Sequence, residues 1–199
     1  HLQNIVWTNH GPALPEDVAL LQANAMLNHQ SVVVTHVDKF PYMVNYHIPK
    51  GVRIADASRV RLGAYLGEGT TIMPAGFVNF NAGTLGNAMI EGRVSAGVIV
   101  GEDSDVGGGA SIMGTLSGGN DHVISVGKKC LLGANSGIGI SLGDGCTVAA
   151  GVYVTAGKKV TLLNESNEAV DQNGNAVPAG QNIVKAAELS GADYRLFIE

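Results

Sequence analysis

The chain has 199 residues, of which 45% are hydrophobic and 15% are charged, and its formal net charge is −5. This apolar content excludes an intrinsically disordered chain, and the negative charge offers no support for binding to nucleic acid or to an anionic membrane. The sequence has no signal peptide pattern and no apolar run of about 18 residues, so we expect a cytoplasmic protein. It starts at His1, inside what reads as a folded segment, and we expect further residues upstream.

Residues 1–50 are predicted to be the remnant of an α/β N-terminal domain followed by a linker. Residues 4–7 and the β-branched residues 31–35 are typical of strands. Pro15, followed by two acidic residues, favours a helix start, and apolar residues then recur at helical spacing. Residues 37–50 contain two prolines and are interpreted as the linker.

Over residues 51–162 a small aliphatic side chain returns at every sixth position. This period matches neither the 3.6 residues of a helical turn nor the alternation of a strand. It is typical of a chain that turns a corner every six residues, so that three hexads close one triangular coil. We therefore predict a mainly β fold, a left-handed parallel β-helix. The first run is Val60, Leu66, Ile72 and Val78, and later runs are Val94 to Ile112, Val126 to Ile138, and Leu142 to Val160.

The repeat is interrupted at two places. The register shifts back by two between Glu91 and Ser95, and no register fits residues 114–125. A solenoid accommodates an insertion as a loop, and a local break in a regular repeat is where a functional site is expected.

Beyond the repeat, residues 163–199 are predicted to form a C-terminal β cap over the open end of the solenoid. Asn173 and Gly174 form a strong hairpin-turn signal. The segment 183–186 is compatible with either a strand or a helix. Cys130 and Cys146 lie within the repeat and are interpreted as buried, reduced thiols.

Several segments carry a closer resemblance. Residues 76–86 read Gly-Phe-Val-Asn-Phe-Asn-Ala-Gly-Thr-Leu-Gly, and residues 90–97 read Ile-Glu-Gly-Arg-Val-Ser-Ala-Gly. With the stretches at 105–118 and 132–137, they resemble the tetrahydrodipicolinate N-succinyltransferase family of hexapeptide-repeat acyltransferases. The resemblance is good over residues 37–162. It implies a homotrimer that moves succinyl from succinyl-CoA to the amino group of 2-amino-6-oxopimelate in lysine and diaminopimelate biosynthesis.

The resemblance also implies roles for particular residues. Glu91 follows an inward position and should point toward a corner or cleft, and it is the predicted catalytic carboxylate, acting either as a base or through an acyl anhydride. Gly114 is the second predicted catalytic residue, since a free backbone N–H suits an oxyanion. Arg93 could hold a carboxylate in bidentate fashion. The other predicted cofactor-binding residues are Gly108, Ser111, Ala134, Ala149, Ala150, Gly157 and Lys185.

We expect no metal requirement. Some family members place acidic residues at the positions of Ser58 and Ala75, where three chains can share a divalent ion, and serine and alanine supply no carboxylate. The chain also ends at Glu199, before the tail that covers CoA in the family, so the role of that tail in CoA binding is open.

Three alternative functions compete with this interpretation. The first is another CoA-dependent acetyltransferase of the same fold, with His122 as the general base. The second is a γ-class carbonic anhydrase, which needs three histidines around zinc, whereas the repeat contains His122 alone. The third is an ice-binding or scaffold solenoid, but Thr70, Thr71 and Thr84 do not share a period of 18. On physical grounds the sequence does not distinguish succinyl from acetyl as the transferred group.

Overall fold

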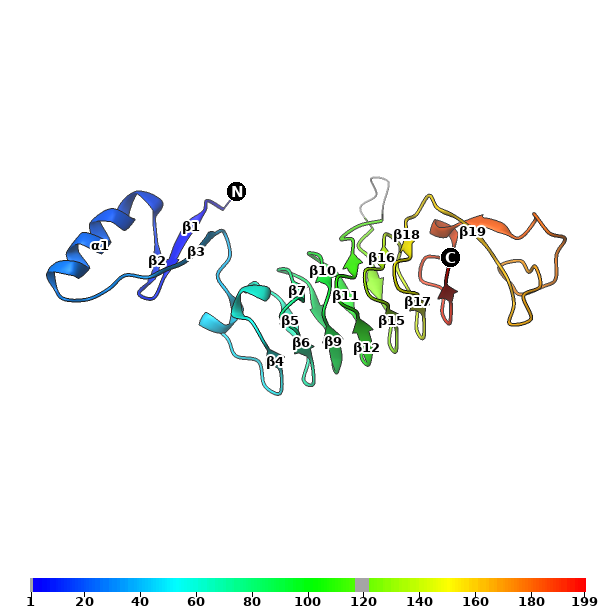
Figure 1. Cartoon of the computed structure of the whole chain (residues 1–199), viewed down its shortest axis with the longest axis horizontal. Coiled ribbons are helices and arrows are strands. Elements are labelled where there is room, and N and C mark those ends of the chain that lie inside the picture. The colour runs from blue at the N-terminus through cyan, green and yellow to red at the C-terminus, as the bar shows by residue number, and fades with distance from the viewer. Residues whose placement is uncertain (1, 117–121) are drawn as a thin grey trace.

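The computed structural model describes residues 2–116 and 122–199. Figure 1 shows an N-terminal α/β unit at one end, a stack of coils in the middle and a C-terminal segment at the other end. The part of the chain that the structure describes has no helix long and apolar enough to cross a membrane.

The N-terminal unit is a three-stranded antiparallel sheet with one helix. Its elements are β1 (Ile5–Thr8), β2 (Gly11–Ala13), η1 (Pro15–Asp17), α1 (Val18–Leu27) and β3 (Val34–Asp38), and the strand order is β2-β1-β3. The two strands and the helix were therefore predicted correctly in type and order. The second strand lies three residues later than predicted, because the Asn9 side chain binds the backbone of Ser31 and Val33 and holds these residues out of the ladder.

Residues 39–52 attach this unit to the first coil. The segment contains η2 (Met43–Asn45), and Met43 is 1% exposed. The Arg61 guanidinium lies 2.9 Å from the Asp38 carboxylate, and the Phe40 and Phe80 rings stack with their centroids 4.5 Å apart. The predicted linker is thus held against the solenoid by an ion pair and by aromatic packing.

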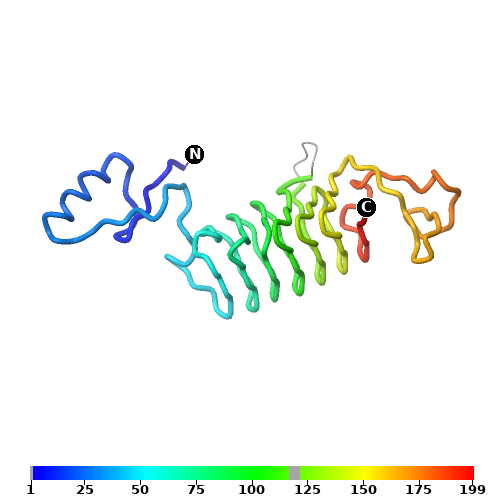
Figure 2. Tube along the Cα trace, viewed as in Figure 1, coloured from blue at the N-terminus to red at the C-terminus, as the bar shows by residue number. Residues whose placement is uncertain are grey.

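Three parallel sheets, named here face 1, face 2 and face 3, form the solenoid (Figures 1 and 2). Strands from successive coils lie side by side within each face, and the 3-10 helix η3 (Ala57–Arg59) lies in the first coil. Face 1 contains β4 (Arg53–Ile54), β6 (Thr71–Ile72), β9 (Ala88–Ile90), β12 (Ser104–Val106), β15 (Leu131–Leu132), β17 (Thr147–Val148) and β21 (Leu196–Phe197). Face 2 contains β7 (Phe77–Val78), β10 (Arg93–Val94), β13 (Ser111–Ile112), β16 (Gly137–Ile138) and β18 (Tyr153–Val154). Face 3 contains β5 (Tyr65–Leu66), β8 (Gly83–Thr84), β11 (Ile99–Val100) and β14 (Ser125–Val126).

The predicted parallel β-solenoid is therefore confirmed, and its left-handed sense stays a prediction. The repeated aliphatic residues form the core, because the last residue of each short strand points into the coil. On face 2 the inward ladder is Val78, Val94, Ile112, Ile138 and Val154, each 0% or 1% exposed. Burying these side chains is the main favourable contribution to the stability of such a stack.

The C-terminal segment returns to cover the end of the stack. After β18, β19 (Lys159–Thr161) pairs antiparallel with β20 (Ile183–Lys185), and η4 (Ala186–Leu189) follows. Strand β21 then lies beside β17 on face 1, and Phe197 pairs with Val148 and is 7% exposed. Asn173 and Gly174 lie in a turn, as predicted, between the antiparallel bridge partners Val170 and Ala176.

Candidate functional site

The corner where face 1 turns into face 2 collects five of the predicted site residues. In successive coils this corner consists of residues 73–76, 91–92, 107–110, 133–136 and 149–152. Backbone hydrogen bonds join its layers: Gly109 N–H donates to Glu91 O at 3.3 Å, Asn135 N–H to Gly108 O at 2.9 Å, and Gly151 N–H to Ala134 O at 2.9 Å. Glu91, Gly108, Ala134, Ala149 and Ala150 therefore lie along one continuous line.

The corner is shortest at Glu91. Only three residues separate the inward Ile90 and Val94, whereas five separate Val106 from Ile112 in the next coil. Strand pairing continues on both sides, so the predicted two-residue shift of register is absorbed at this corner. The layer that carries Glu91 thus projects less than the next layer, and its half-buried side chain lies beneath the longer corner of the next coil.

Gly108 provides the space beside the Glu91 carboxylate. A methyl group at position 108 would lie 3.4 Å from Glu91 Oε2, and Gly108 is itself half-buried. The Glu91 backbone is held by a hydrogen bond from its N–H to Val106 O at 2.8 Å. Within residues 2–116 and 122–199 Glu91 has no ion-pair partner, so its carboxylate is available to a ligand.

Arg93 and Ser111 lie side by side on the outer surface of face 2. They are direct partners in the β10–β13 pairing, and Arg93 is exposed. The Arg93 guanidinium forms no ion pair with any residue that the structure describes. A guanidinium without a protein partner next to a hydroxyl is suited to binding a carboxylate.

Gly114 lies at the opposite edge of face 2 from Glu91. It follows β13, its carbonyl accepts from Ile124 N–H at 3.2 Å, and a methyl group on it would lie 3.3 Å from Ala96 O. Thr115 and Val123 pair antiparallel at the base of the predicted insertion, whose residues 117–121 lie outside the described part of the chain. His122, the base of the alternative hypothesis, is exposed beside this pairing.

Gly157 and Lys185 lie together near the end of the solenoid. Gly157 follows β18 and precedes Lys158, whose carbonyl accepts from Ala186 N–H at 2.8 Å, and Lys185 pairs with Lys159. Gly157 follows the face 2 strand β18 on the side away from the Glu91 corner, and Lys185 lies in the separate β19–β20 sheet. From β10 to β18 there are three strand spacings, or about 14 Å.

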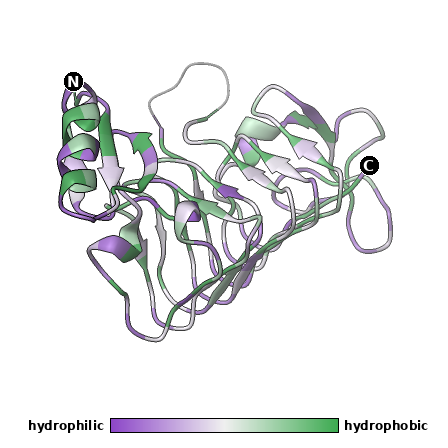
Figure 3. Ribbon diagram, turned by 60° about the vertical axis from the view of Figure 1, so that its left-hand side comes forward, coloured by the Kyte–Doolittle hydropathy of each residue, from purple (hydrophilic) through white to green (hydrophobic). Residues whose placement is uncertain are grey.

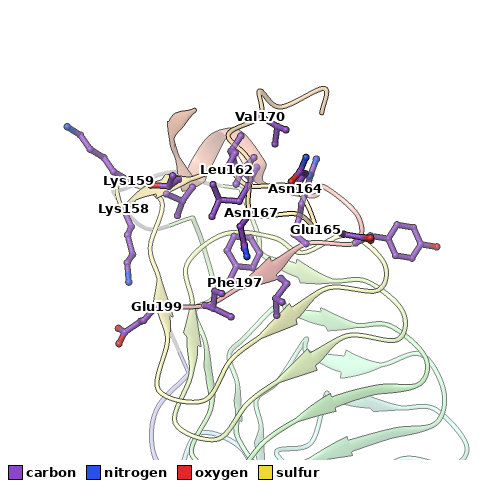
Figure 4. A pocket seen from close by; sticks show the side chains of 17 residues that line it. Lys158, Lys159, Leu162, Asn164, Glu165, Asn167, Val170, Phe197 and Glu199 are labelled. Carbon is purple, nitrogen blue, oxygen red and sulfur yellow. The ribbon is translucent and has the colours of Figure 1, made fainter. Parts of the chain in front are cut away.

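A cavity of about 820 Å³ lies where the C-terminal segment meets the last coil (Figure 4). Leu162, Val170 and Phe197 line its apolar part, and in Figure 4 Lys158 and Lys159 point outward from its rim. Lys158 and Lys159 are not among the predicted cofactor-binding residues. Lys158 directly follows Gly157, and Lys159 pairs with Lys185, so both cations lie close to predicted cofactor-binding residues.

Cys130 and Cys146 occupy equivalent positions in successive coils and are free and buried, as predicted. The Cys130 thiol donates to Gly143 O at 3.0 Å, and the Cys146 thiol donates to Ala192 O at 3.2 Å. Hydrogen bonding to Cys146, together with burial, raises the pKa of the Cys130 thiol above its usual range. This thiol therefore stays protonated, as expected for a structural residue.

Ser58 and Ala75 are exposed, and the Ser58 hydroxyl donates to the Asp56 carboxylate at 2.6 Å. Among the residues whose positions are described, no group of three His, Cys, Asp or Glu side chains could hold a metal ion. The absence of a metal requirement stays a prediction.

The fold and the corner define the class of protein, a hexapeptide-repeat β-solenoid. A family model described as the hexapeptide repeat of succinyl-transferase matches residues 123–156, and one described as the middle part of tetrahydrodipicolinate N-succinyltransferase matches residues 2–42. Two relatives named 2,3,4,5-tetrahydropyridine-2,6-dicarboxylate N-succinyltransferase, from Pseudomonas putida and Vibrio cholerae, are 58% and 57% identical to the chain. Each alignment covers 98% of this chain and 54% of the relative.

A solved structure gives the same result. A Campylobacter jejuni protein described as 2,3,4,5-tetrahydropyridine-2-carboxylate N-succinyltransferase superposes with a TM-score of 0.82 and 46% identity, over 96% of this chain and 50% of that one. The chain is thus homologous over nearly its whole length to tetrahydrodipicolinate N-succinyltransferases, which confirms the resemblance. It spans about half the length of the curated relatives it matches.

Proposed function

We propose that the protein transfers succinyl from succinyl-CoA to the amino group of 2-amino-6-oxopimelate, the opened form of tetrahydrodipicolinate, in the cytoplasm. The observation that carries this proposal is the half-buried Glu91 carboxylate beside Gly108, at the shortened corner of a chain 58% identical to a curated N-succinyltransferase. The product is an amide made in the route to diaminopimelate and lysine. No step of this chemistry requires a metal ion.

The reaction is attack of an amine on a thioester. The amine nitrogen bonds to the thioester carbonyl carbon and loses a proton, and the carbon–sulfur bond then breaks to release the CoA thiol. Glu91 would take this proton and return it to the departing sulfur, which then leaves as the thiol. In the other possible route its carboxylate first displaces the thiol to form an acyl anhydride, which the amine then opens. The unpaired Arg93 guanidinium would hold a carboxylate of the acyl group or of the acceptor.

Gly114 would stabilise the tetrahedral oxyanion through its backbone N–H, which has no acceptor among the residues that the structure describes. Gly114 lies against Ser95 and Ala96, and Ser95 is four positions after Glu91 in the sequence. In an extended chain this is about 13 Å, too far for both groups to act on one carbonyl. We therefore propose a homotrimer in which Glu91 of one protomer and Gly114 of its neighbour share a cleft.

The donor would lie along the solenoid. Ala134, Ala149 and Ala150 leave the corner free of large side chains, so that the pantetheine arm can pass close to the backbone. Gly157 and Lys185 lie farther along, where Lys158 and Lys159 add positive charge for the CoA phosphates. Gly108 and Ser111 would then contact the arm close to its sulfur.

The test is thiol release from succinyl-CoA and from acetyl-CoA, with tetrahydrodipicolinate as the acceptor. We expect turnover with succinyl-CoA, and Glu91→Ala should lower kcat by several orders of magnitude while the protein stays folded and trimeric. The matched control is Glu102→Ala, since Glu102 is an exposed acid whose nearest cation is Lys128 at 4.0 Å. A near-normal kcat for Glu91→Ala would move the base elsewhere, and a severe loss in His122→Ala alone would favour the acetyltransferase alternative.

A further inference from the structure

On the outer surface of face 2, Gly137 and Tyr153 are neighbours on adjacent strands. The outward residues of this face, in order along the solenoid, are Phe77, Arg93, Ser111, Gly137 and Tyr153. The Tyr153 ring lies over Gly137. A methyl group at position 137 would overlap the para end of that ring. Any side chain at 137 would therefore push the ring away, and glycine is what lets it lie flat on the sheet.

This packing places the phenol hydroxyl away from its own strand. The para carbon is the ring atom nearest to Gly137, so the hydroxyl extends from the β18 row over the β16 row toward Ser111. Tyr153 is 41% exposed, and its hydroxyl makes no hydrogen bond within residues 2–116 and 122–199. A phenol both donates and accepts hydrogen bonds, and here both capacities face solvent beside the proposed donor track.

The strand spacing limits what the hydroxyl can reach. Gly137 lies two strands from Arg93, which is about 10 Å at the usual spacing. A group reacting beside Glu91 is therefore out of reach, and an extended arm leading away from it is within reach. Counting bonds, the amide of pantetheine that is farther from the sulfur lies about 9 Å from it in an extended arm.

We propose that Tyr153 is a donor-binding residue whose hydroxyl forms a hydrogen bond with this outer pantetheine amide. Gly137 is required because it admits the ring that carries the hydroxyl. The proposal rests on the proposed function, since it assumes a CoA thioester as the donor. It assigns no part in bond making or breaking to Tyr153.

The decisive variant is Tyr153→Phe, which keeps the ring on Gly137 and removes only the hydroxyl. We expect the KM for succinyl-CoA to rise about tenfold, the usual effect of losing one hydrogen bond to a bound ligand, with kcat and the acceptor KM within twofold of the parent values. Gly137→Ala should raise the KM for succinyl-CoA in the same way, because the added methyl group displaces the Tyr153 ring. The matched control is Tyr65→Phe, a tyrosine that is 64% exposed on face 3.

A truncated donor separates this contact from a general loss of packing. Succinyl-N-acetylcysteamine keeps the inner amide and lacks the outer one, so Tyr153→Phe and the parent protein should use it equally well. A tenfold difference with this donor would overturn the assignment to the outer amide. An unchanged KM for succinyl-CoA in Tyr153→Phe would overturn the inference and leave the proposed function intact.

Failure of the proposed function gives a different result. If the parent protein releases no thiol from succinyl-CoA, the proposed reaction is wrong, and calorimetry with CoA alone then tests the contact. Tighter binding of CoA by the parent protein than by Tyr153→Phe would support the contact. Equal binding, or no binding to either protein, would overturn it.

Discussion

Leu131 and Leu132 are adjacent leucines whose side chains lie on opposite sides of face 1. Truncating each in turn tests which positions point into the coil and which point outward. Leu132 is 0% exposed and pairs with Val106 and Val148 in the core, whereas Leu131 is 44% exposed and points outward. Leu→Ala removes three carbon atoms. At about 0.8 kcal/mol for each buried carbon the transfer loss at Leu132 is about 2.4 kcal/mol, and the cavity left in the stack raises the cost to about 3–4 kcal/mol. Leu131→Ala should cost less than about 1 kcal/mol.

The measurement is urea unfolding followed by circular dichroism, with the free energy of unfolding of both variants compared at matched m-values. The comparison is repeated at several protein concentrations, because a contact between protomers would make the midpoint depend on concentration. If Leu131→Ala lowers the free energy of unfolding as much as Leu132→Ala at every concentration, the assignment of inward and outward positions is refuted.

Two further predictions concern the loop edge and the C-terminal segment. Gly114→Leu should raise the KM for succinyl-CoA by crowding the backbone near Ala96, and an unchanged KM would make this glycine merely structural. Hydrogen bonds from the Asn175 side chain, and then from backbone N–H groups of the same turn, hold the pKa of Asp171 below its usual value. The stability they contribute is therefore complete above about pH 4 and is lost as the pH falls through the native pKa. A carboxyl-carbon NMR titration should show this low pKa and its rise in Asn175→Ala, and a pKa at the usual value in both would contradict the assignment.

Where the fold was predicted well, the determinants were local. The inward aliphatic residues recur because each coil turns a corner after a fixed number of residues, so the period itself is the signature of the solenoid. The break near Glu91 was predicted for the same reason. A corner that is two residues shorter shifts the positions of all later inward residues in the six-residue repeat. Strand β3 begins later than predicted because the Asn9 side chain, from another segment, forms hydrogen bonds with the backbone of Ser31 and Val33.

The candidate site was predicted residue by residue through the resemblance, but its layout was not. Local sequence does not show that Glu91 and Gly114 lie at opposite edges of one face, because the distance between them depends on how successive coils are stacked. Nor does it show that Tyr153 covers Gly137. These residues are 16 apart in the sequence, and they meet only because two coils align in register.

By itself the sequence determined the period, the identity of the inward residues and the places where the repeat is interrupted, because each of these depends on neighbours within a few residues. Tertiary structure decided which outward residues become neighbours on adjacent coils. It also decided that β21 pairs with β17 at the end of the solenoid. Stacking brings together residues 16 to 49 positions apart through backbone pairing, and no short stretch of sequence specifies which coil will lie against which.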